Sequence, residues 1–96
     1  PDLGADVPEQ VELAGCGGEY RRALDLSAAA YARLRDEGHA LAAVYALCLG
    51  YRIRFILDLN AREAMQLVEL RSGREGHPSY RAVAHEMHTQ ISAVHP

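Results

Sequence analysis

Hydrophobic and polar positions alternate from residue 51 to residue 59, and this is the clearest pattern in the chain. The odd positions are apolar or aromatic, and the even positions are Arg52, Arg54, Ile56 and Asp58. A period of two, rich in β-branched and aromatic residues, is typical of a β-strand. The competing interpretation is one long helix over 40–70, which would scatter the odd-numbered apolar residues around its whole circumference. We therefore predict a strand near 51–59.

Helical spacing accounts for most of the chain before this strand. Residues 7–14 can form a short helix, and apolar positions recur at helical spacing from 19 to 37. Gly38 is suited to end the second of these helices. The segment 40–49 is apolar nearly all round, which predicts a short helix that is buried on most sides and ended by Gly50.

Two more helices are predicted after the strand. Asn60 is a strong N-cap, and Glu63 stands at the third helical position, as in a capping box. This helix is expected to run to about Arg71 and to stop before Gly73. Pro78 suits the first position of a last helix, whose apolar stripe is Tyr80, Val83, Ala84, Met87, Ile91 and Val94.

The predicted fold class is mainly α, an α+β fragment with about four to five helices and the single strand near 51–59. We expect one domain over residues 1–96, because a chain of this length supports only a modest core. A lone strand cannot satisfy its own backbone hydrogen bonds. The partner strand must come from missing sequence or from another copy, so we expect part of a larger protein, an obligate oligomer, or both.

Composition narrows the function classes. The chain is 49% hydrophobic, which indicates a globular protein. A net charge of -3 does not favour nucleic-acid binding, which depends on a strongly basic surface. The sequence contains no signal peptide or membrane span. Cys16 and Cys48 do not form a spaced metal pair, and Cys48, between two leucines, is expected to be buried. We favour a reducing, cytoplasmic setting.

All ten basic residues are arginine, and two interpretations remain open. Arginine forms bidentate contacts with anions such as phosphate. The richness in alanine favours genomic base composition as the cause for the chain as a whole. Individual arginines must therefore be judged by their positions.

The helix that begins after Asn60 carries the main candidate chemistry. Its first turn has free N–H groups and the positive end of the helix dipole, which suits an anion. Arg62, Gln66 and Glu69 share one face of this helix. A cation close to the positive end of the helix dipole is unfavourable, so the charge of Arg62 needs a compensating negative charge. That charge comes either from an ion pair, for instance with Asp58 or Glu69, or from a bound anion.

Arg71 lies at the opposite end of the same helix, where the dipole favours a cation. It either serves that structural role or clamps an anionic group of a different ligand. His85 and His88 are three residues apart and could face one ion, but no convincing third ligand accompanies them, so no metal is expected. His77, before Pro78, is expected to be a loop or cap residue.

The run Asn60-Ala61-Arg62-Glu63-Ala64-Met65, followed by Leu67 and Leu70-Arg71, resembles the C-terminal half of flavin-dependent thymidylate synthases. The preceding segment, with Arg54-Phe55, matches the place of that family's Thr-Arg-Phe-type strand. The segments 76–81 and 84–88 are similar to a long, actinobacterial-type branch of the family. The resemblance covers most of the chain, and it rests on the ordered combination of these runs.

The resemblance implies a reaction and a set of roles. The family converts dUMP to dTMP with FAD, NADPH and methylene-tetrahydrofolate. By resemblance, Asn60 and Arg62 contact FAD, and Gln66 stands where the family usually places Asn or His near FAD. Arg71 matches the arginine that binds dUMP and helps to polarise the pyrimidine, which makes it both a catalytic and a substrate-binding candidate. The family forms homotetramers whose sites combine several chains.

Departures from the family pattern keep alternatives open. The Arg-His-Arg-x7-Ser signature is absent from these residues and belongs N-terminal to them. Val44 stands where many members carry a substrate-binding Arg, and the usual Ala-Gln-Trp-Glu-Ile run is replaced by residues 77–81. One alternative is a degenerate, non-catalytic oligomerisation or scaffold domain of the same fold. Another is a small helical regulatory or binding protein with no link to the family.

Overall fold

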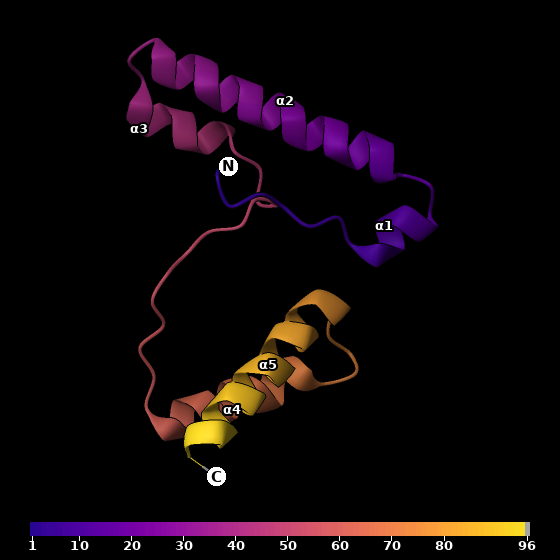
Figure 1. Ribbon diagram of the computed structural model, residues 1–96, viewed down its shortest axis with the longest axis vertical. Coiled ribbons are helices and arrows are strands. Elements are labelled where there is room, and N and C mark those ends of the chain that lie inside the picture. The colour runs from indigo at the N-terminus through magenta and orange to yellow at the C-terminus, as the bar shows by residue number, and fades with distance from the viewer. Residues whose placement is uncertain (96) are drawn as a thin grey trace. The chain divides into compact units, whose positions relative to one another are not determined.

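Helices dominate the computed structural model, which describes residues 1–95 (Figure 1). Five α-helices and one 3-10 helix follow in the order α1 (Glu9–Leu13), α2 (Gly17–Asp36), α3 (Ala40–Ala43), η1 (Val44–Ala46), α4 (Ala61–Ser72) and α5 (Pro78–Val94). The mainly helical fold class and the number of helices are therefore confirmed. The chain divides into two compact units, Pro1–Phe55 and Ile56–Pro96, which are described separately. The prediction of a single domain stays a prediction.

The predicted strand near 51–59 is wrong for this chain by itself. Within the described residues, the β-pairing consists of one isolated antiparallel bridge between Ala5 and Tyr51. Arg52 N–H donates to Gly4 O over 2.9 Å, and residues 53–59 follow without regular secondary structure. Figure 1 shows them as an open trace that leads into α4. The alternating pattern is real, but a strand also needs a partner backbone, and residues 1–95 do not provide one.

Helix α2 has the predicted C-terminal stop. Gly38 has a φ of +88°, a left-handed conformation that costs glycine little. Gly38 N–H donates to Arg35 O, and His39 N–H donates to Leu34 O over 2.9 Å. These two bonds form a Schellman motif, which satisfies carbonyl groups that the helix end leaves open. The chain then turns back along α2, so α3 and η1 pack on it (Figure 1).

The predicted helix over 40–49 is shorter than expected and ends before Gly50. A four-residue α3 passes into η1, and regular structure stops at Ala46. The reason lies on α2, where the Ser27 hydroxyl donates to Ala46 O over 2.7 Å and accepts from Cys48 N–H over 2.8 Å. These side-chain bonds replace the helical bonds that would continue the element.

The predicted burial of this segment is also wrong within the chain. Ala43 is fully buried, but Leu41, Tyr45 and Leu49 are at least 89% exposed. Cys48 is exposed as well, against the prediction of a buried small hydrophobe. One flank of a short helix contacts α2, and no other element of the unit covers the rest. An apolar circumference therefore predicts burial only when enough neighbouring elements are present.

Side chains around Tyr51 and Arg52 fix the start of the open segment. The Tyr51 hydroxyl donates to Leu24 O over 2.6 Å. Desolvation raises the pKa of this phenol, and the charges of Cys48 and Asp25 raise it further. Arg52 pairs with Asp6, with 3.0 Å between Nε and Oδ2, and this hydrogen bond and charge raise the pKa of the guanidinium. Both groups therefore keep their protons at neutral pH.

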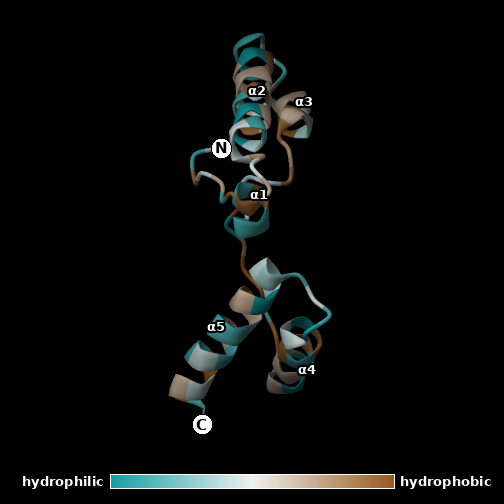
Figure 2. Cartoon of the chain, turned by 90° about the vertical axis from the view of Figure 1, so that its right-hand side faces the viewer, coloured by the Kyte–Doolittle hydropathy of each residue, from teal (hydrophilic) through white to brown (hydrophobic). Residues whose placement is uncertain are grey.

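The second unit is a pair of packed helices, α4 and α5. Ala64 of α4 and Ala84 of α5 are the buried apolar residues of this pair, and their small side chains let the two helices approach closely. Larger apolar residues, including Met65, Leu70 and Val83, stay at least 60% exposed. Figure 2 shows the mixed polar and apolar colouring of both helices. No helix within residues 1–95 is long and apolar enough to cross a membrane.

Candidate functional site

The N-terminus of α4 has the predicted capping box. Asn60 Oδ1 accepts from Glu63 N–H over 2.9 Å, and Asn60 N–H donates to Glu63 Oε2 over 3.1 Å. The two side chains thus satisfy two backbone N–H groups at the start of the helix. The Asn60 side-chain NH₂ group and the backbone N–H groups of Ala61 and Arg62 stay available to a ligand, since the cap does not use them.

We expect Asn60→Ala to destabilise α4 by about 1 kcal/mol, because the Glu63 N–H loses its acceptor. Urea denaturation followed by circular dichroism measures this cost. Asn60→Ser is the matched control, since serine is also a good N-cap and should retain most of the stability. Equal stability of the alanine and serine variants would contradict a role for the cap.

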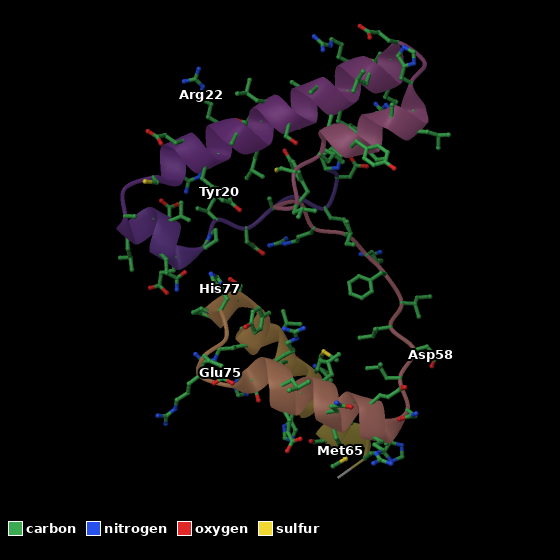
Figure 3. All side chains as sticks on the ribbon, turned by 180° about the vertical axis from the view of Figure 1, so that it is seen from behind. Tyr20, Arg22, Asp58, Met65, Glu75 and His77 are labelled. Atoms are coloured by element: carbon green, nitrogen blue, oxygen red, sulfur yellow. The ribbon has the colours of Figure 1, made fainter. Side chains whose placement is uncertain are left out.

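Arg62 lies in the first turn of α4 and is exposed. The ion pairs within the described residues are Arg21 with Glu12 and Arg52 with Asp6. The ion pair of Arg62 with Asp58 or Glu69, one of the two open alternatives, is therefore not formed there. Figure 3 shows Asp58 on the open segment before α4. The Glu63 carboxylate in the same turn supplies some negative charge, but the Arg62 guanidinium makes no ion pair with it in the part of the chain that the structure describes.

Gln66 and Arg71 come together at one hollow of about 260 Å³ on α4, which they line with Glu63, Leu67 and Leu70. Asn60 and Arg62 do not line this hollow. The structure thus brings two of the four candidate residues together and leaves the other two at the helix start. Asn60 is linked to the hollow only through its capping partner Glu63.

Arg71 also borders a second hollow, of about 220 Å³, between α4 and α5. Its guanidinium carbon lies over the Tyr80 ring, 5.6 Å from the ring centroid, which is a cation–π contact. Sequence reasoning placed Tyr80 only in the apolar stripe of the last helix. Its role beside Arg71 has no signal in the helical period, because the loop between α4 and α5 decides which residues meet.

Two larger hollows on this helix pair are mainly apolar. One, of about 500 Å³, involves Leu57, Leu59 and residues of both helices. The other, of about 330 Å³, is bordered by Ala61 and Met65 from the start of α4. The second one adjoins the turn that holds Arg62, so polar donors and an apolar surface occur side by side there.

Three histidines lie at the start of α5 or along it. His77 is the N-cap of α5, and its Nδ1 accepts from Ser79 N–H over 3.1 Å, which confirms the predicted cap role (Figure 3). His85 and His88 are exposed on α5. In the described part of the chain, no group of three or more His, Cys, Asp or Glu side chains is placed to hold a metal ion.

Comparison with known proteins assigns the family. Residues 4–96 match the family described as "Thymidylate synthase complementing protein", and the chain belongs to this family. It is the family of flavin-dependent thymidylate synthases, so the predicted resemblance is confirmed. No solved structure gives a significant match.

Two curated relatives extend over nearly the whole chain. One is a "UPF0159 protein" of Chlamydia muridarum, 34% identical over 94 residues, which are 98% of this chain and 18% of the relative. The other is the "UPF0159 protein Ta1429" of Thermoplasma acidophilum, 31% identical over 94 residues, which are 97% of this chain and 19% of the relative. The chain thus spans about a fifth of the length of the curated relatives it matches.

Proposed function

We propose that these residues form the C-terminal, mainly helical part of a flavin-dependent thymidylate synthase-like enzyme. The enzyme would methylate dUMP reductively to dTMP, with FAD, NADPH and methylene-tetrahydrofolate. The observation that carries the proposal is the family match over residues 4–96, which includes α4 and its N-cap and thus all four candidate residues. The activity belongs to the whole polypeptide, of which this chain supplies one part of the site.

The start of α4 fits the FAD role. Arg62 has no ion-pair partner within residues 1–95, and the N–H groups of Ala61 and Arg62 are not used by the capping box. These donors suit the anionic diphosphate of a flavin nucleotide. The apolar hollow beside Met65 suits a ring system. Asn60 adds its side-chain NH₂ group, and Gln66 adds an amide one turn further along.

The end of α4 fits the dUMP role. The Arg71 guanidinium is exposed and lines the same hollow as Gln66. Its fork of N–H donors suits a phosphate or a pyrimidine carbonyl group, and a positive charge near that carbonyl polarises the ring. The bound flavin supplies the reducing equivalents, whereas this chain's residues hold and orient the two nucleotides. A homo-oligomer that combines several chains in one site completes the proposal.

Arg62→Ala in the full-length polypeptide is expected to weaken FAD binding at least tenfold, because a charge-assisted hydrogen bond contributes about 1.5–3 kcal/mol. Flavin fluorescence titration of the apoprotein measures the affinity. Arg22→Ala is the matched control, since Arg22 is an exposed arginine on α2 (Figure 3) and should leave the affinity unchanged. Unaltered flavin affinity in Arg62→Ala would count decisively against this assignment.

A non-catalytic oligomerisation or scaffold domain of the same fold is the second candidate. The observation that favours it is the exposure of apolar side chains such as Ile53 and Ile56, which suits association whether or not chemistry follows. Flavin titration of the full-length wild-type polypeptide separates the two. Saturable FAD binding supports the enzyme, and its absence supports the scaffold.

A further inference from the structure

Arg71, Gly76 and Tyr80 form a small cluster where the loop after α4 enters α5. Arg71 stands in the last turn of α4, and Tyr80 is the third residue of α5. The guanidinium lies over the Tyr80 ring at 5.6 Å, while Gly76 lies in the loop between them. The cluster therefore ties the end of one helix to the start of the next.

Gly76 gives the Tyr80 ring its place. A Cβ atom at position 76 would lie 2.5 Å from Tyr80 Cε2 and 2.6 Å from its Oη, which is closer than non-bonded carbon atoms approach. The ring thus rests against the bare backbone of Gly76 on one side and contacts the guanidinium on another. Any side chain at position 76 would have to displace the ring.

The contact holds Arg71 without using its donors. A cation–π contact engages the guanidinium through its positive charge and does not require its N–H groups as hydrogen-bond donors. An ion pair would consume those same groups. Arg71 makes no ion pair within residues 1–95 and lines the hollow that also contains Gln66. The arrangement orients a cation and leaves it ready for an anionic ligand.

We propose that Tyr80, seated against Gly76, is a positioning residue that orients the Arg71 guanidinium toward the pyrimidine nucleotide. This rests on the proposed role of Arg71 and adds to it a residue that does not touch the ligand. Tyr80 acts through Arg71 alone, so its removal weakens nucleotide binding and leaves FAD binding unchanged.

Two measurements on the full-length polypeptide test the proposal. The first is the rate at which phenylglyoxal modifies Arg71, followed by mass spectrometry of the Arg71 peptide. The second is the dissociation constant for dUMP, measured by calorimetry on the FAD-loaded protein. The variants are Tyr80→Leu, which removes the ring, Tyr80→Phe, which keeps it, and Gly76→Ala, which displaces it.

Tyr80→Leu and Gly76→Ala should each speed the modification of Arg71 and weaken dUMP binding about tenfold, since a misplaced binding group costs more than the lost contact alone. Tyr80→Phe should restore both values to those of the wild type. Tyr31→Leu is the matched control, because Tyr31 carries a similar contact with Arg35 at 5.5 Å on α2. It should change neither value.

The outcomes separate this inference from the function on which it rests. Unchanged Arg71 modification in Tyr80→Leu would overturn the inference. So would wild-type dUMP affinity in Tyr80→Leu if Arg71→Gln weakens dUMP binding as expected, although the proposed function would then stand. Absence of dUMP binding in the FAD-loaded wild type would overturn both. A weakened Tyr80→Phe variant would assign the effect to the hydroxyl group and not to the ring.

Discussion

Arg71→Gln in the full-length polypeptide should weaken dUMP binding about 100-fold, with FAD content unchanged. The side chain is exposed, faces a hollow shared with Gln66, and makes no ion pair within the described residues. Its loss removes charge-assisted hydrogen bonds to an anionic ligand, and 100-fold corresponds to about 3 kcal/mol. Glutamine keeps much of the length and polarity, so the lost charge dominates the effect.

Calorimetry with dUMP on the FAD-loaded protein measures this loss. Arg74→Gln is the matched control, because Arg74 is exposed in the loop just after α4 and is not among the residues that line the two Arg71 hollows. It makes the same change of charge a few residues away and should retain wild-type affinity. Wild-type affinity in Arg71→Gln would remove Arg71 from the site. An equal loss of affinity in both variants would point to a general effect of the net charge.

Phe55→Ser should destabilise the full-length polypeptide by about 3 kcal/mol, although Phe55 is exposed in the chain alone. Ile53 and Phe55 share one face of the alternating segment, and both are at least 68% exposed. An exposed apolar face with unpaired backbone groups is the edge that a further strand covers. We expect that strand to come from elsewhere in the polypeptide or from another copy.

Arg54→Ser is the matched control for Phe55→Ser, since the alternating pattern predicts Arg54 on the opposite face of a strand and the same residue replaces it. It should unfold at nearly the wild-type urea concentration. Hydrogen exchange supplies the direct test of pairing, because the amides of residues 53–59 should be protected in the native protein. If those amides exchange as fast as an unstructured peptide, no strand pairs there. Sedimentation then shows whether the covering strand comes from a second copy.

Local signals predicted the helices well. The Asn60 capping box, the Gly38 stop and the His77 cap each depend on residues within a few positions of each other. Such bonds form wherever the local sequence allows them, whatever packs outside. The prediction of a helix over 40–49 failed because Ser27, which is distant in sequence, sets the end of this helix. The prediction of a strand near 51–59 failed because a strand forms its backbone hydrogen bonds with a partner strand.

At the candidate site, too, local spacing predicted some features and contacts between distant residues decided others. Spacing along one helix placed Arg62 near the start of α4 and Arg71 at its end, and it left open whether Arg62 pairs with a carboxylate. The structure answered that question, because the ion pairs within residues 1–95 are formed by Arg21 and Arg52. It also brought Tyr80 to Arg71, a contact that no helical period predicts. The roles in binding FAD and dUMP remain proposals that the experiments above test.

The sequence by itself determined the helices outside 40–49 and their caps, the alternating pattern and the resemblance to the family, because these depend on local bonds and on the order of residues. Only the tertiary structure decided that Tyr80 contacts both Gly76 and Arg71. It also decided that, within residues 1–95, the β-pairing of the alternating segment is limited to the single bridge between Tyr51 and Ala5. The physical reason is that such contacts depend on loops and neighbouring elements, whose geometry no local pattern contains.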